Sequence, residues 1–177
     1  QVVATYLIGL YLGQAVGTLS ERQIEALYNE MLELPAKIEQ ILETVEPLRE
    51  LTRSFADSSS VLFLGRHVGY PVALEGALKL KELAYMHAEG FAGGELKHGP
   101  IALIDQGTPV IAIVPNTHDH GLDEKMLSNI QEVRARGAKV IAIAAEGIEI
   151  PGAEHVIRIP SAPQLLQPVL ALSLIHI

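Results

Sequence analysis

Short, almost wholly apolar runs recur from residue 61 onward, and they constrain the fold more than any other feature of the chain. Helical patterns over 70–86 and 121–136 separate the first three of these runs. Strands that are apolar on both faces are typical of a parallel sheet covered by helices on both sides. The sequence therefore predicts an α/β fold, a three-layer α/β/α domain with a central parallel sheet. Its strands are expected at residues 61–65, 109–115, 139–145 and 155–160.

The first 60 residues are different, because they read as a succession of helices that ends at the polar stretch 57–60. The first helix, over 2–17, is apolar nearly all round, and its glycines have the spacing of membrane helix dimers. It is only about 16 residues long, whereas a membrane span needs about 20. We therefore expect no membrane association, but a buried helix with partners on several sides. The helices that follow are expected at 21–34, 36–45 and 47–55.

Composition excludes several classes of function. The chain has no cysteine, which rules out disulfides, thiolate metal sites and a cysteine nucleophile within it. The absence fits a reducing compartment, and we expect a cytoplasmic protein. A net charge of −8 disfavours nucleic acid as a partner, because a phosphate backbone attracts basic surfaces.

No metal or cofactor is expected. No two histidines have metal-ligand spacing on a helix, and the sequence THDH at 117–120 is interpreted as a surface turn. The glycines of GRHVGY at 65–70 make a weak phosphate loop, and neither a GxGxxG nor a Walker pattern is present.

The helical segment LEGALKLKELAYM at 74–86 is apolar yet carries paired charges. At about 100° per residue, Glu75, Lys79 and Glu82 fall within about 60° of one another, with small residues on the opposite face. One interpretation is a solvated stripe of i,i+3 and i,i+4 ion pairs. The other is a charged wall of an active site at the rim of the sheet, because ligands gather at the carboxyl ends of parallel strands.

The segment HAEGFAGGELKHGP at 87–100 follows that helix and is read as a glycine-rich loop before the next strand. Its glycines permit tight turns or a close approach to a ligand. His98 lies in this loop, where catalytic residues are frequently placed, although an exposed loop histidine without a function is the alternative.

The stretch LFLGRHVGYPVALEGALKLKELAYMHAEGFAGGELKHGPIALID at 62–105 resembles the second sugar-isomerase (SIS) domain of the glucosamine-6-phosphate synthases, also called glutamine–fructose-6-phosphate aminotransferases (isomerizing). The blocks ALEGALKLKE and GELKHGPIALI are specific to that family. The resemblance implies an enzyme of amino-sugar biosynthesis that binds fructose 6-phosphate, accepts ammonia released from glutamine, and yields glucosamine 6-phosphate.

The resemblance also implies roles for individual residues. Glu82 matches the glutamate that moves a proton between C1 and C2 of the sugar, and Lys79 matches a lysine of the same site. His98 matches the histidine that assists ring opening and reaches the site from the neighbouring subunit, which implies a homodimer. We further expect Glu75, Lys81 and Arg66 to line or support the substrate pocket.

Set against that family, the chain is expected to be a fragment. Residues 1–17 match the last helix of a preceding SIS domain, 18–60 a helical connector, and 61–171 the second SIS domain, while 172–177 is read as a non-native tail. The glutaminase domain, most of the first SIS domain with its phosphate-binding loops, and a tail lysine have no counterpart. We expect the chain to be inactive alone.

Two other functions remain open. A sugar-phosphate-binding regulatory SIS module would need no proton-transferring base, so the glutamate, lysine and histidine count against it. A stand-alone sugar-phosphate isomerase would need its own phosphate loop rich in Ser and Thr. The serines at 58–60 precede the first strand, on the wrong side of the sheet for a ligand.

Overall fold

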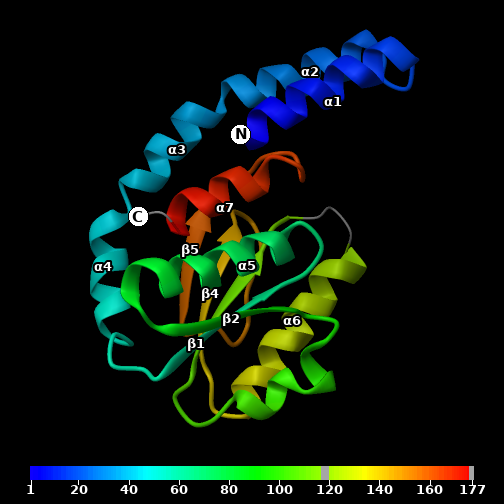
Figure 1. Cartoon of the computed structure of the whole chain (residues 1–177). Helices are drawn as coiled ribbons and strands as arrows, with labels where there is room; N and C mark the ends of the chain where they lie inside the picture. The colour runs from blue at the N-terminus through cyan, green and yellow to red at the C-terminus, as the bar shows by residue number, and fades with distance from the viewer. Residues whose placement is uncertain (117–119, 176–177) are drawn as a thin grey trace.

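The computed structural model describes residues 1–116 and 120–175. A helical N-terminal part leads into a parallel sheet covered on both faces (Figure 1). In chain order the elements are α1 Val2–Val16, α2 Glu21–Leu32, α3 Leu34–Leu42, α4 Val45–Arg53, β1 Ser60–Gly65, α5 Gly69–Lys79, the π-helix η1 Leu80–Ala84, β2 His87–Ala92, the 3₁₀ turns η2 Leu96–His98 and η3 Pro100–Leu103, β3 Pro109–Val114, α6 His120–Ala135, β4 Lys139–Ala145, β5 His155–Ile159 and α7 Gln167–Ile175.

The sheet has five parallel strands in the order β2-β1-β3-β4-β5, which confirms the expected α/β fold. Gly65 pairs with both Ala92 and Ile113, so β1, β2 and β3 end level with one another. The turn after β1 is tight, because a Cβ on Gly65 would lie 2.3 Å from the Gly69 carbonyl oxygen. Chain segments that leave these strands are thereby brought to one edge.

The strand β2 was missed, and the prediction of a loop over this segment was wrong. It lies at the edge of the sheet, and Ala88 is its one fully buried residue. The strand therefore lacks the continuous apolar run that a central strand requires. Its assignment depends on backbone pairing with β1 rather than on its side chains.

Alternating strand residues feed two separate cores. On one face, Val61 and Phe63 pack with α5 and α7. On the other face, Leu62 and Leu64 pack with α6 and with Leu96 of η2. Segments on these two sides of the sheet cannot touch each other through it.

The helix expected over 70–86 is shorter and changes type. α5 ends at Lys79 and continues as the π-helix η1, and Tyr85 then takes a left-handed conformation with φ 53°. The Met86 amide donates to the Leu80 carbonyl at 3.4 Å, which closes the wide turn. No glycine or proline marks this end, so no stop signal for the helix could be recognised in the sequence.

The N-terminal helices follow the expected boundaries to within a few residues, and Ser20 and Gln23 form a capping box at the start of α2. The expectation that the first helix is buried was wrong, because none of the residues of α1 is buried. The described chain covers only part of its surface: Leu19 packs on Gly13, and the Tyr6 hydroxyl donates to the Leu165 carbonyl. α1 and α2 form a pair that stands away from the sheet (Figure 1).

No helix in the described part of the chain is long and apolar enough to cross a membrane. At the other end, α7 runs without a break through residue 172 to Ile175, and Leu174 is buried in the core. The boundary expected at 171 therefore falls inside a helix, and the division into domains stays a prediction.

Candidate active site

Three of the charged residues of α5 and η1 form one cluster on the outer face of the helix. The Lys79 ammonium lies 2.6 Å from Glu82 Oε2 and 3.5 Å from Glu75 Oε1. The opposite face is made of small residues, and Ala73 and Ala77 are buried against the sheet. The expected common face of the three charges is thus present, and we call Glu75, Lys79 and Glu82 the charged triplet.

The position of the triplet differs from the expected one at the carboxyl rim of the sheet. α5 begins just after β1 ends and runs back along the sheet, so its last turns lie toward the amino ends of the strands. Glu82 precedes the first residue of β2 by only five positions. The triplet therefore faces outward along the helix, and whatever it binds must approach α5 from the side away from the sheet.

Electrostatics fix the state of the lysine. The hydrogen bond to Glu82 is the main cause that raises the pKa of Lys79, and both carboxylates add attraction, against a smaller desolvation that lowers it. Lys79 is therefore an ammonium at neutral pH. It can balance a developing negative charge, but it cannot accept a proton.

Exposed apolar side chains flank the triplet. They are Leu74, Leu78, Leu83 and Tyr85, with exposed fractions between 40% and 90%. A cluster of half-exposed charges flanked by apolar side chains is typical of one side of a cleft whose other side is contributed by a different domain or subunit. Lys81, expected to support the pocket, is exposed, and no ion pair joins it to another of the described residues.

His98 and Arg66 lie on the other side of the sheet from the triplet. His98 ends η2 and is exposed, next to Leu96, which is buried in the core that α6 covers. The Arg66 Nε donates to Asn129 Oδ1 of α6 at 2.8 Å. Within one copy of the chain, the structure brings together Glu75, Lys79 and Glu82 but leaves His98, Arg66 and Lys81 apart from them.

Several buried polar residues were not anticipated. Asn129 and Gln167 are 4% and 0% exposed, and Glu132 has a carboxylate oxygen that is buried without a hydrogen-bond partner among the described residues. Asn129 and Glu132 interrupt the apolar face of α6, which is the signal that could have marked them. Nothing in the sequence around Gln167 sets it apart from its neighbours.

The described residues contain no group of three or more histidine, aspartate or glutamate side chains that could hold a metal ion. Residues 117–119 of the sequence THDH lie outside the described part of the chain. The interpretation of that sequence as a surface turn is therefore not tested.

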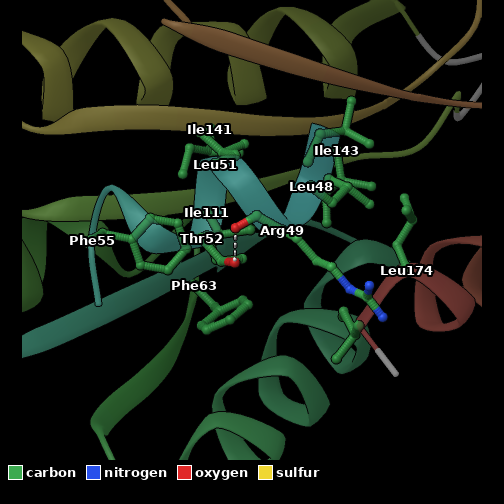
Figure 2. A pocket seen from close by; sticks show the side chains of 12 residues that line it. Leu48, Arg49, Leu51, Thr52, Phe55, Phe63, Ile111, Ile141, Ile143 and Leu174 are labelled. Atoms are coloured by element: carbon green, nitrogen blue, oxygen red, sulfur yellow. Dashed lines mark hydrogen bonds between the residues drawn. The ribbon is translucent and has the colours of Figure 1, made fainter. Parts of the chain in front are cut away.

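An apolar hollow of about 170 Å³ lies between α4, the end of α7 and the sheet (Figure 2). Its wall is almost entirely aliphatic and aromatic, with Phe55 and Phe63 on one side and isoleucines of the central strands on another. Arg49 reaches its rim but pairs with Glu46, while Thr52 hydrogen-bonds the Arg49 carbonyl. The hollow offers too few polar groups for a sugar phosphate, which needs several convergent donors.

Comparison with known proteins agrees with this architecture. The profile of the SIS domain family matches residues 54–175. A glutamine–fructose-6-phosphate aminotransferase (isomerizing) from Streptomyces coelicolor is 56% identical over 174 residues, and one from Corynebacterium diphtheriae is 57% identical over 175 residues. Each match covers 97% of this chain but 28% of the relative, so the chain spans little more than a quarter of these proteins.

A solved structure gives the same result. The C-terminal domain of glucosamine-fructose-6-phosphate aminotransferase from Francisella tularensis is similar with a TM-score of 0.89 and 35% sequence identity. This match covers 98% of the chain and 50% of that structure. The resemblance expected from the motifs is thereby confirmed, and, with the family profile covering more than half of its length, the chain belongs to the SIS domain family.

Proposed function

We propose that this chain carries the proton-transferring half of a glutamine–fructose-6-phosphate aminotransferase (isomerizing), which converts fructose 6-phosphate and glutamine-derived ammonia to glucosamine 6-phosphate. The observation that carries the proposal is the Lys79 ammonium held between Glu75 and Glu82 on an open helix face. The 56% identity to a relative of that name supports the choice of reaction.

The triplet suits the chemistry of such a site. After ammonia condenses with the C2 carbonyl and water leaves, a proton must move from C1 to C2, and the C1 hydroxyl proton must pass to the imine nitrogen as C1 becomes the aldehyde. Glu82 takes the C1 proton and returns it to C2, so the carboxylate is regenerated in each cycle. Such a group contributes about 10²–10⁴-fold. Lys79, held as an ammonium, stabilises the negative charge that develops on oxygen during the transfer.

His98 acts on the site of a second copy. In one copy it lies on the α6 side of the sheet and is exposed, whereas the triplet lies on the α5 side. Ring opening by His98 at the same sugar as Glu82 therefore requires a neighbouring subunit, which supports a homodimer. We propose a supporting role around the sugar for Glu75, Lys81 and Arg66.

The remaining parts of the site come from the sequence that longer relatives possess and this chain does not span. The triplet is half-open to water, and a proton transfer of this kind needs a site that excludes water. We propose that the preceding SIS domain covers it and binds the phosphate, and that this chain alone has no activity. In this scheme residues 1–17 belong to that domain, 18–60 connect the two, and the enzyme works in the cytoplasm.

The two alternatives are less well supported. A regulatory module gains nothing from a lysine bridged by two carboxylates. For a stand-alone isomerase, the serines at 58–60 would have to bind phosphate, yet they lie at the amino end of β1 beside the turn that precedes β3. The charged side chain that lines the hollow beside these serines is Asp105, whose carboxylate disfavours a bound phosphate.

The decisive experiment follows hydrogen exchange at C1 and C2 of fructose 6-phosphate by NMR in deuterated buffer. It compares this chain with a chimera in which the chain replaces the matching 28% of the Streptomyces coelicolor relative. We expect exchange with the chimera only, and loss of exchange on Glu82→Gln but not on Glu89→Gln, a change on the edge strand β2. Undiminished exchange with Gln at position 82 would show that the base lies elsewhere.

A further inference from the structure

The segment that carries His98 is attached to α6 along successive turns of that helix. At its start, Gly93 packs against Asn129 of α6 and against Arg66, which follows β1, so closely that a Cβ on Gly93 would meet both side chains. Asn129 Oδ1 accepts a hydrogen bond from Arg66 Nε at 2.8 Å. One turn later Glu132 Oε1 lies 2.9 Å from the Lys97 ammonium. Just past the end of α6, Arg136 donates to the Ile101 carbonyl at 3.3 Å. These contacts lie on both sides of His98 in the sequence.

Most backbone hydrogen bonds of the segment, such as that from the His98 amide to the Glu95 carbonyl, lie within its own turns, so contacts to α6 help to fix where those turns lie. Gly93, Gly94 and Gly99 flank the turn η2, and Gly99 has φ 141°, which suits glycine best. Only Leu96, 2% exposed, anchors the turn in the core. Lys97 and His98 are both exposed, so His98 is placed by its neighbours rather than by contacts of its ring.

Glu132 is the least conventional member of this attachment. Its side chain is 23% exposed, and one carboxylate oxygen is fully buried without a hydrogen-bond partner among the described residues. The other oxygen accepts from Ser128 and faces Lys97. Removing a carboxylate from water costs free energy unless a cation lies beside it. The position of the Lys97 ammonium is therefore more strongly restricted here than in an ion pair whose carboxylate is fully solvated.

We propose that Glu132 is a positioning residue for His98, acting through Lys97. The pair fixes the turn η2 on α6, and thereby sets where the imidazole is presented to a neighbouring subunit. The inference rests on the proposed function, because it assumes that His98 assists ring opening. Asn129 and Arg66 pack against Gly93 at the start of the same segment.

The first test measures amide hydrogen exchange in this chain and does not depend on activity. Glu132→Gln and Lys97→Gln are each expected to speed exchange at residues 96–99 by about two- to fivefold. Glu124→Gln, on an exposed turn of the same helix, is expected to leave it unchanged. Lys97→Gln also covers the case in which Glu132→Gln fails to fold, since Lys97 is 68% exposed. Unchanged exchange in Lys97→Gln would overturn the proposal.

The second test compares two substrates in the chimera. 5-Deoxyfructose 6-phosphate lacks the hydroxyl that closes the ring, so its turnover needs no ring opening. Glu132→Gln should lower kcat for fructose 6-phosphate about tenfold and change kcat for the deoxy sugar less than about twofold, because misplacing one group affects the step that uses it. Equal losses on both substrates would assign Glu132 a structural role only and would overturn the proposal.

His98→Gln separates this inference from the function on which it rests. If His98→Gln shows the substrate-selective loss and Glu132→Gln does not, the positioning role fails while the ring-opening role stands. If His98→Gln shows no selective loss, the ring-opening role fails, and the positioning role fails with it. The reciprocal pair Lys97→Glu with Glu132→Lys should restore selectivity if the contact itself matters.

Discussion

The Lys79 ammonium lies 2.6 Å from Glu82 Oε2 across the junction where the α-helix α5 becomes the π-helix η1. The contact joins two helix types. Lys79 is the last residue of the α-helix, whereas Glu82, the carboxylate proposed as the base, lies in the π-helix. π-Helical turns of this kind occur frequently at functional sites. The relationship makes the end of α5 the first place to test.

Replacing Lys79 is expected to destabilise the chain in a pH-dependent way. Its pKa is raised above the ordinary value of 10.5, chiefly by the hydrogen bond to Glu82, so the folded state binds the proton more tightly than the unfolded state. The stabilisation that charged Lys79 gives is therefore complete below about pH 10.5, and it is lost as the pH rises through the higher pKa of the folded state. Urea midpoints of the wild type and Lys79→Met should differ at pH 8 and converge above pH 10.5. Lys81→Met, without an ion pair among the described residues, should show no such convergence.

Tyr85→Gly is expected to stabilise the chain by about 0.5 kcal/mol. Tyr85 has φ 53°, a left-handed conformation that costs a non-glycine residue about 1 kcal/mol. Glycine avoids this cost, but part of the benefit is lost because glycine has more conformational freedom in the unfolded state. The ring is 90% exposed, so its removal forfeits little packing. Thermal unfolding measures the difference. Tyr85→Ala removes the same ring and keeps the backbone cost, and a gain as large as that of glycine would contradict this explanation.

How much of this could be read from the sequence differs between elements. The central strands and the helix face shared by Glu75, Lys79 and Glu82 were predicted, because both depend on local periodicity. The edge strand β2 was not, because its pairing with β1 joins residues such as Val61 and Ala88 that are far apart in sequence. The outward placement of the triplet also escaped prediction, since it depends on the direction in which α5 crosses the sheet.

Polar contacts between segments that are far apart in the sequence are the second kind of feature that could not be predicted. Asn129 and Glu132 could be flagged as polar residues on an apolar helix face, but their partners Arg66 and Lys97 lie on distant segments. The exposure of α1 has a different origin. Its sequence is apolar on all sides, which is typical of a helix that packs against several neighbours, but the described chain covers only part of its surface.

Gly93→Ala is expected to cost about 1–3 kcal/mol of folding free energy, in the range of an overpacked site. A Cβ there would lie 2.6 Å from Asn129 Oδ1 and 2.9 Å from Arg66 Nε, so the hydrogen bond between these side chains must break or shift. Gly94→Ala is the matched control, because its Cβ meets only Arg66 Nη1, at 3.9 Å. Chemical denaturation measures both. Similar costs at the two positions would mean that the clash at Gly93 is relieved without breaking the bond.

Gln167 joins the loops that follow β3 and β5, and its replacement tests whether those loops are held from within. It is fully buried at the start of α7; Nε2 donates to the carbonyls of Asn116 and Ala162 at 3.2 and 2.9 Å, and Oε1 accepts the Asn116 amide at 2.6 Å. Gln167→Met keeps the volume but removes all three hydrogen bonds, and we expect a loss of about 2–4 kcal/mol, because buried polar groups that lose partners are costly. Gln164→Met, at a half-buried position whose amide lies 3.4 Å from the His67 Nδ1, should change stability by less than about 0.5 kcal/mol. Denaturant unfolding of both variants decides the matter, because equal and small effects would mean that water replaces Gln167 and that the loops at this edge of the sheet are held by their backbones.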